Sequence, residues 1–188
     1  MSTIILCRHG RPAWDYRTAI AGRAFAEWRR GEDLAPLDDR SHPSPELKRL
    51  AQTASRFVTS PLRRSLESAQ RLRPDAAVFT SELFREAASP CSFRWGRGAH
   101  LRPDLWAAVA RSAWFCGWSE GGESLAAARE RASRAAALLT DPTATHDVTL
   151  VVGHGMMNIL IGHVLRANGW RGPRIPSPRH WSFGIYRR

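Results

Sequence analysis

Short apolar runs alternate along this chain with longer segments in which apolar residues recur every three or four positions. An unbroken apolar run is typical of a strand buried on both faces of a parallel sheet, and the longer period is typical of an amphipathic helix. We predict strands at residues 3–7, 57–59, 76–79 and 148–152, and an alternating edge strand at 181–186. The pattern indicates an α/β fold with a mostly parallel central sheet and one antiparallel edge strand.

Helical patterns fill the segments between the predicted strands. Ser44 and Pro45 mark the start of a helix that reaches about Ala54, because serine caps a helix and proline suits its first position. We predict further helices at residues 60–72, 103–115, about 122–140 and 156–168, and a short one at 24–30 within the polar segment 11–45. Helices that connect parallel strands cover both faces of the sheet, which predicts a three-layer α/β/α sandwich.

The segment at residues 89–122 is rich in tryptophan, and we interpret it as a helical insertion that lies over the strand ends. Its helix is expected to place four apolar residues on one face, namely Leu105, Trp106, Val109 and Ala113. Two interpretations of the tryptophans, which include Trp95, Trp106 and Trp114, stay open: ordinary packing and recognition of a substrate. No repeat or linker divides the chain, so its 188 residues are expected to form one domain.

The formal net charge of +11 favours an anionic substrate or partner, because the field of the protein concentrates anions near its surface. The basic residues are almost all arginine, with Lys48 as the only lysine, and they are scattered along the chain. This scatter does not favour nucleic acid as the partner, since binding to nucleic acid usually gathers basic residues in blocks or on one face. A general preference for arginine explains the charge as well.

The cysteines Cys7, Cys91 and Cys116 show no close pairing or Cys-x-x-Cys spacing, so neither a disulfide framework nor a zinc site is expected. No stretch approaches the roughly 20 apolar residues that a membrane span needs. The chain also begins directly with a strand pattern instead of a targeting segment. We therefore expect a cytoplasmic protein that does not bind membranes.

Polar motifs follow several predicted strands. Arg8-His9-Gly10 follows the first strand, Ser60-Pro61-Leu62-Arg63-Arg64 follows the second, Glu86 follows the third, and Gly153-His154-Gly155 follows the fourth. Because the carboxyl ends of parallel strands meet at one edge of a sheet, we expect these residues to form one polar site. Arginines and histidines gathered in this way suit phosphoryl transfer, in which charge on the transferring group must be held and stabilised.

This ordered set, within residues 3 to about 167, resembles the histidine phosphatase superfamily, also called the phosphoglycerate-mutase-like family. The resemblance implies a phosphomonoesterase of the histidine acid phosphatase type, in which His9 attacks the ester and forms a phosphohistidine that water hydrolyses. It implies that Arg8, Arg64 and His154 bind the phosphoryl group and that Glu86 donates a proton to the leaving group. Gly10 and Gly155 are expected to let the backbone approach the phosphate. This mechanism uses no cofactor and no metal.

The chemistry of the side chains fits these roles. A guanidinium group offers a planar fork of donors to two phosphate oxygens at once. Arg64 stands at the position of the family's phosphate-binding arginine, and Arg63 is expected to face solvent. His9 must be neutral to attack, and we expect the positive charge of nearby arginines to lower its pKa. A hydrogen bond from Nδ1 to a carbonyl oxygen would fix its tautomer. His154 is expected to act as a charged or donor imidazole. For Glu86, an ion pair with Arg85 or another arginine stays open as the alternative to the role of proton donor.

The chain departs from the family pattern in two places. Arg11-Pro12-Ala13-Trp14-Asp15 replaces the usual continuation with Glu-Thr and Trp-Asn, which leaves substrate recognition open. The chain also stops at Arg188 soon after its last predicted strand, without the extended tail of the mutases, which favours hydrolysis. We expect a small phosphorylated metabolite as the substrate, or a phosphorylated protein side chain. The alternatives are a phosphoglycerate-mutase-like phosphotransferase and an inactive protein that binds anions or nucleic acid.

A second phosphatase motif is discounted. Cys91 and Arg97 stand at the Cys-x5-Arg spacing of cysteine-dependent phosphatases, but Pro90 precedes the cysteine where a strand should end. Four other histidines are expected to lie outside the site, namely His100, His146, His163 and His180.

Overall fold

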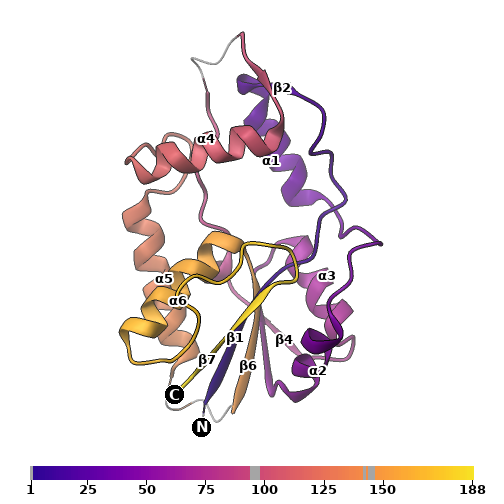
Figure 1. Cartoon of the computed structure of the whole chain (residues 1–188), viewed down its shortest axis with the longest axis vertical. Helices are drawn as coiled ribbons and strands as arrows, with labels where there is room; N and C mark the ends of the chain where they lie inside the picture. Colours follow the sequence, from indigo (N-terminus) through magenta and orange to yellow (C-terminus); the bar gives the residue numbers. More distant parts are fainter. Residues whose placement is uncertain (1, 94–97, 142, 144–146) are drawn as a thin grey trace.

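A five-stranded sheet forms the centre of the molecule in the computed structural model, which describes residues 2–93, 98–141, 143 and 147–188 (Figure 1). The strand order is β4-β3-β6-β1-β7. The strands are β1 (Thr3–Arg8), β3 (Arg56–Thr59), β4 (Val78–Thr80), β6 (Val148–Gly153) and β7 (Phe183–Arg187). The first four pair in parallel and β7 pairs antiparallel with β1. The predicted mostly parallel sheet with an antiparallel edge strand is confirmed.

Helices cover both faces of this sheet. On one face lie α2 (Pro45–Thr53) and α3 (Arg63–Leu72), and on the other lie α5 (Leu125–Leu139) and α6 (Gly155–Ala167) (Figure 1). Successive residues of β1 enter different cores: Leu6 packs on the α5 and α6 side, whereas Cys7 packs on the α2 and α3 side. This alternation follows from the two-residue period of a strand. The three-layer sandwich is confirmed.

Local capping residues start two of these helices. The Ser44 hydroxyl accepts a hydrogen bond from the Leu47 amide at 3.2 Å at the start of α2, as predicted. The Ser124 hydroxyl accepts from the Ala127 amide at 3.1 Å at the start of α5. These bonds satisfy amide groups that have no partner within the first turn.

A smaller group of elements lies above the carboxyl edge of the sheet (Figure 1). It contains α1 (Phe25–Leu34), α4 (Pro103–Phe115), the short 3-10 helix η1 (Gly22–Ala24), and a two-stranded sheet of β2 (Ile20–Ala21) and β5 (His100–Leu101). A second 3-10 helix, η2 (Glu82–Phe84), follows β4 and places Phe84 in the core on the α5 and α6 side of the sheet. The cluster of Phe25, Phe93, Trp106 and Ala110 joins α1 to α4. The insertion therefore lies over the strand ends as predicted, and α1 extends beyond the predicted range of 24–30.

The buried face of α4 differs from the predicted one. The buried residues are Pro103, Trp106, Ala110 and Trp114, whereas Leu105 is 51% exposed. Trp106 and Trp114 lie eight residues apart on one side of the helix, and contacts with other elements bury that side. Both rings are buried, Trp106 in the cluster that joins α1 to α4 and Trp114 in the core on the α5 and α6 side of the sheet. Trp95, Arg97 and His146 lie outside the described residues.

Two strand boundaries also differ from the prediction. The strand predicted at 76–79 is β4, over Val78–Thr80, and the strand predicted at 181–186 is β7, over Phe183–Arg187. Trp181 has a φ of 59°, which is left-handed and incompatible with a strand, so the chain turns there before β7 begins. Within the described part of the chain, no helix is both long and apolar enough to cross a membrane.

Candidate active site

Strand register brings the two ends of the chain together at the candidate site. Arg8 pairs with Gly153 in the ladder between β1 and β6, so His9 and His154 leave their strands at the same level. The His9 amide extends the ladder by donating to the Gly153 carbonyl at 3.0 Å. The two imidazole ring centres lie 4.9 Å apart. The predicted meeting of the two histidine motifs therefore occurs.

The His9 ring is held from both of its nitrogen atoms. Nδ1 lies 2.7 Å from the Gly10 carbonyl oxygen, and Nε2 accepts a hydrogen bond from Arg64 Nε at 3.2 Å. A carbonyl can only accept and a guanidinium can only donate, so the proton lies on Nδ1 and the lone pair on Nε2. Burial lowers the pKa of His9 well below its usual value, and His154, Arg64 and Arg8 lower it further. The predicted fall in this pKa therefore occurs, but burial and not the charge of the arginines is its larger cause.

Arg64 stands in the first turn of α3, and its side chain is only 3% exposed. Its Nη1 donates to the Asp33 carboxylate at 2.8 Å and to the Glu32 carbonyl at 3.3 Å, both near the end of α1. These bonds fix the guanidinium plane beside His9. The neighbouring Arg63 is 55% exposed and pairs with Glu67 at 2.6 Å, so Arg64 and not Arg63 points into the site.

Arg8 lies against the first turn of α6. A Cβ atom built on Gly155 would lie 3.7 Å from the Arg8 Cδ and Nε atoms. Arg8 Nη1 donates to the Pro178 carbonyl, and Nε is buried without a hydrogen-bond partner among the described residues. Arg8 therefore offers a charged, buried donor to an anion at this end of the sheet.

His154 is completely buried beside two hydroxyl groups. Its Nε2 lies 2.7 Å from the Ser60 oxygen and 3.3 Å from the Ser65 oxygen, and its Nδ1 has no partner within the described part of the chain. Burial lowers the pKa of His154 well below its usual value, and Arg64 and Arg8 add to the effect. Of the two predicted forms, the neutral donor is therefore the one that the site favours.

Glu86 caps α6 from a different part of the chain. Its Oε1 accepts from the amides of Ala87 at 2.9 Å and Met157 at 3.0 Å, and its Oε2 accepts from the Met156 amide at 3.3 Å. These bonds replace the cap that the side chain of His154 does not provide. Arg85 pairs with Glu82, and no ion pair joins Glu86 to another described residue. The alternative that Glu86 simply pairs with Arg85 or another arginine is therefore wrong for the arginines that the structure describes.

The two glycines beside the histidines differ in their surroundings. A Cβ atom on Gly10 would lie 2.5 Å from the Trp181 ring and 2.8 Å from Leu37, whereas one on Gly155 would meet only Arg8 at ordinary distances. The Gly10 amide also donates to Ser68 at 2.9 Å. Gly10 therefore serves the packing of the Trp181 indole, and its amide is already engaged.

Sequence reasoning placed His180 outside the site, which is wrong. Its ring centre lies 5.5 Å from that of His9, and burial, helped by Arg8 and Arg11, lowers its pKa to about 3. Because Cys7 pairs with Phe183, the residues just before β7 must lie at the carboxyl end of β1. Pairing of the predicted edge strand with the first strand would have been enough to place His180 in the site. His100 and His163 are exposed and lie on β5 and α6.

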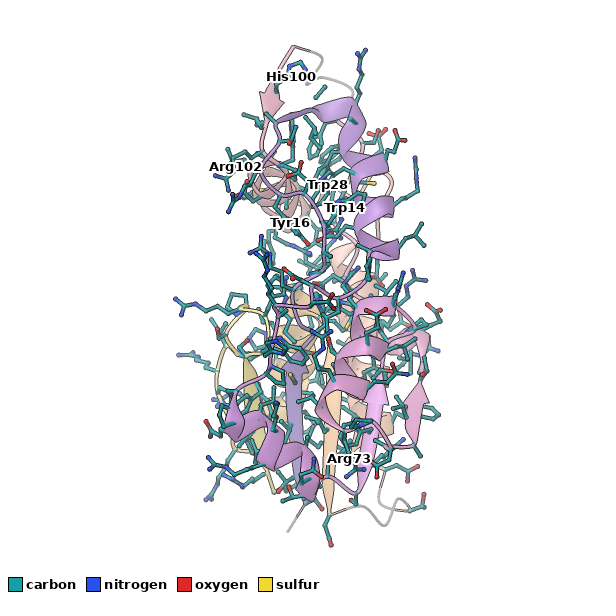
Figure 2. All side chains as sticks on the ribbon, turned by 90° about the vertical axis from the view of Figure 1, so that its right-hand side faces the viewer. Trp14, Tyr16, Trp28, Arg73, His100 and Arg102 are labelled. Atoms are coloured by element: carbon teal, nitrogen blue, oxygen red, sulfur yellow. The ribbon has the colours of Figure 1, made fainter. Side chains whose placement is uncertain are left out.

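An aromatic group lies between the insertion and the sheet, and it consists of Trp14, Tyr16 and Trp28 (Figure 2). The ring centres of Tyr16 and Trp28 lie 5.3 Å apart, and those of Trp14 and Trp28 lie 6.4 Å apart. The Tyr16 hydroxyl donates to the Glu32 carboxylate at 2.7 Å, beside the residue that holds Arg64. Trp14 remains 38% exposed. Trp14 comes from the segment that departs from the family pattern, and the group reaches the site through Tyr16 and Glu32, whose carbonyl accepts from Arg64.

No group of three or more histidine, cysteine, aspartate or glutamate side chains gathers at a metal-binding distance among the residues that the structure describes. The site instead combines two arginines, three uncharged imidazoles, one carboxyl group and the start of α6. Such a set can hold a tetrahedral anion and provide a neutral nitrogen nucleophile.

Known proteins match this chain both in sequence family and in fold. The family model described as the histidine phosphatase superfamily (branch 1) matches residues 4–183. YhfR of Bacillus stearothermophilus has a similar structure, with a TM-score of 0.62, 19% identity, and coverage of 98% of this chain and 90% of that chain. The mycobacterial glucosyl-3-phosphoglycerate phosphatase, in complex with VO3, has a TM-score of 0.55 and 21% identity, covering 88% of this chain and 82% of that one. Phosphoserine phosphatase from Entamoeba histolytica, in complex with 3-phosphoglyceric acid, has a TM-score of 0.54 and 18% identity, covering 89% and 81%. No curated protein matches the chain by sequence.

Proposed function

This chain belongs to the histidine phosphatase superfamily, and we propose that it hydrolyses phosphate monoesters through a phosphohistidine formed at His9. The observation that carries the proposal is the state of the His9 ring. Its proton lies on Nδ1 against the Gly10 carbonyl, and its Nε2 lone pair faces the guanidinium group of Arg64. A neutral imidazole is a nucleophile through its unprotonated nitrogen, and the lowered pKa keeps His9 neutral. When the phosphoryl group binds, Arg64 turns its donor from Nε2 to a phosphoryl oxygen in this proposal.

Arg8, Arg64 and His154 bind the phosphoryl group in this proposal. The two guanidinium groups neutralise the charge on its equatorial oxygens, and Arg8 Nε is a buried donor without a partner among the described residues. His154 contributes through Nδ1, because Nε2 is engaged by Ser60. The proposal has the Ser60 hydroxyl donate to Nε2 instead of to the Ser65 oxygen 3.1 Å away. The single ring proton of neutral His154 then lies on Nδ1 and can be donated to a phosphoryl oxygen.

The reaction then proceeds in two displacements. Nε2 of His9 attacks phosphorus in line, the bond between phosphorus and the ester oxygen breaks, and protonated Glu86 donates its proton to the leaving alkoxide. Water next attacks the phosphohistidine, the phosphorus–nitrogen bond breaks, and the Glu86 carboxylate accepts a proton from that water. Inorganic phosphate leaves, and both His9 and Glu86 return to their starting states.

The proposed substrate is a small phosphorylated metabolite. The net charge of +11 supports an anionic substrate. Two structures with the same fold are phosphatases named for glucosyl-3-phosphoglycerate and phosphoserine. A phosphorylated protein side chain is the alternative substrate, and the finer assignment to the histidine acid phosphatase type stays a prediction.

Release of phosphate from a panel of esters tests this function. The panel contains phosphoserine, phosphoglycerates, sugar phosphates, nitrophenyl phosphate and a phosphoserine peptide, each with a chelator from acidic to neutral pH. We expect activity that survives the chelator and disappears in His9→Ala, with a small metabolite as the best ester. Transfer to an added alcohol in preference to water would instead indicate a phosphotransferase. A folded wild-type protein inactive on every ester would contradict the proposal and favour an anion-binding role.

A further inference from the structure

The segment that carries Glu86 has no regular secondary structure after η2, and arginine side chains bind its carbonyl groups. Arg131 of α5 donates to the carbonyls of Leu83, Arg85 and Glu86, and Arg111 of α4 donates to that of Ala87. The Glu123 amide donates to the Ala88 carbonyl at 2.9 Å. Because a sheet ladder or helix supplies none of these bonds, the path of this segment depends on these side chains.

The Arg131 guanidinium group uses all of its N–H donors. Nη1 donates to Leu83 at 3.0 Å and to Arg85 at 2.8 Å. Nη2 donates to the Glu86 carbonyl at 3.3 Å, and Nη2 and Nε bind the Glu123 carboxylate at 2.6 and 2.9 Å. Arginine has five such donors, so none is left for the Glu86 carboxyl group. Arg131 therefore fixes the backbone of Glu86 without forming an ion pair with its side chain.

Glu123 is itself held in place, so that it can orient Arg131. The Trp114 indole donates to the Glu123 carbonyl at 2.6 Å. The preceding residue, Gly122, packs so closely that a Cβ atom there would lie 2.6 Å from the Ala88 oxygen. The end of the insertion thus packs against the segment that carries Glu86. The ion pair between Arg131 and Glu123 joins the two segments to α5. Both side chains share with Glu86 the lining of an open pocket of about 330 Å³.

We propose that Arg131, oriented by Glu123, is a positioning residue that sets the Glu86 carboxyl group against the ester oxygen of the substrate. This inference rests on the proposed function, in which Glu86 is the proton donor. A proton donor acts only within hydrogen-bond reach, and a displacement of about 1 Å can cost on the order of a hundredfold in rate. Three carbonyl bonds from one rigid guanidinium group supply that precision, which a flexible lysine cannot reproduce.

The test measures single-turnover cleavage, with enzyme in excess, of an alkyl phosphate and of nitrophenyl phosphate. Only the alkyl ester needs a proton donor, because nitrophenolate leaves without one. We expect Arg131→Gln to slow cleavage of the alkyl ester by about ten- to a hundredfold and that of nitrophenyl phosphate by less than about threefold. Arg134→Gln, an exposed arginine on the same helix, is the matched control and should leave both rates unchanged.

A double variant separates positioning from general destabilisation. Adding Arg131→Gln to Glu86→Gln should slow the alkyl ester no further than Glu86→Gln alone, and Arg131→Lys should recover only part of the rate. Glu123→Gln should show the same selectivity more weakly, and it provides the test if Arg131→Gln does not fold. Equal losses on both esters, with Glu86→Gln still selective, would overturn the positioning role. If Glu86→Gln is itself unselective, the proposed role of Glu86 fails and this inference with it.

Discussion

The Nδ1 atom of His9 lies 2.7 Å from the carbonyl oxygen of Gly10. This contact fixes the ring proton on the side away from the nucleophilic Nε2 before any substrate binds. Burial lowers the pKa of the same ring well below 6.5, and His154, Arg64 and Arg8 lower it further. The nucleophile is therefore prepared by the backbone of its own motif, by its burial, and by the neighbouring arginines.

The lowered pKa of His9 predicts that activity persists at acidic pH. A histidine with a lowered pKa stays neutral as the pH falls through 6.5, so the nucleophile is not lost there. We expect kcat/KM for nitrophenyl phosphate, corrected for ionisation of the ester, to show no acidic limb between pH 7 and 5. An acidic limb with an apparent pKa near 6.5 would show that the nucleophile titrates normally.

Replacing Arg64 by lysine should cost at least about a hundredfold in kcat/KM, or about 2.7 kcal/mol of transition-state stabilisation. Arg64 binds His9 through Nε and Asp33 through Nη1 at the same time, and a single ammonium group cannot reproduce that fork. Arg63→Lys is the matched control, because Arg63 is the next residue and is 55% exposed. Equal kinetics for the two variants would argue against the assignment of Arg64.

Gly10→Ala should lower the free energy of unfolding more than Gly155→Ala does. A Cβ atom on Gly10 would lie 2.5 Å from the Trp181 ring, and such overpacking typically costs about 1–3 kcal/mol. A Cβ atom on Gly155 would lie 3.7 Å from Arg8, at ordinary contact distance, so stability should change by less than about 1 kcal/mol. Urea unfolding of both variants measures the difference, and a stable Gly10→Ala protein would contradict the packing argument.

Two tryptophans near the site should respond differently to removal. Trp114 is completely buried, so Trp114→Ala should lower the free energy of unfolding by about 3–5 kcal/mol. Trp14 is 38% exposed within the aromatic group that borders the site, so Trp14→Ala should change KM across the ester panel more than it changes stability. Thermal unfolding and KM values, measured on both variants, distinguish a role in stability from a role in substrate recognition. Unchanged KM values in Trp14→Ala would remove that residue from substrate recognition.

Local sequence pattern was sufficient for the sheet and for the residues at its strand ends. Apolar runs located the strands, and because parallel strands align their carboxyl ends, Arg8, His9, Arg64 and His154 could be placed together from sequence. The buried face of α4 could not be predicted, because contact with α1 decides which of two apolar faces packs. His180 enters the site only through pairing of β7 with β1, and Glu86 is held by α5 and α6. Contacts between residues distant in the sequence leave no local period.

Trapping the phosphorylated enzyme tests the central claim most directly. Wild-type protein and His9→Ala are mixed rapidly with nitrophenyl phosphate and quenched in alkali, where phosphohistidine survives, and the phosphate is located by mass spectrometry of the peptides. We predict acid-labile phosphate on His9 in the wild type and none in His9→Ala. Release of phosphate by the wild type without any phosphorylated His9, or with the phosphate on another residue, would contradict this account.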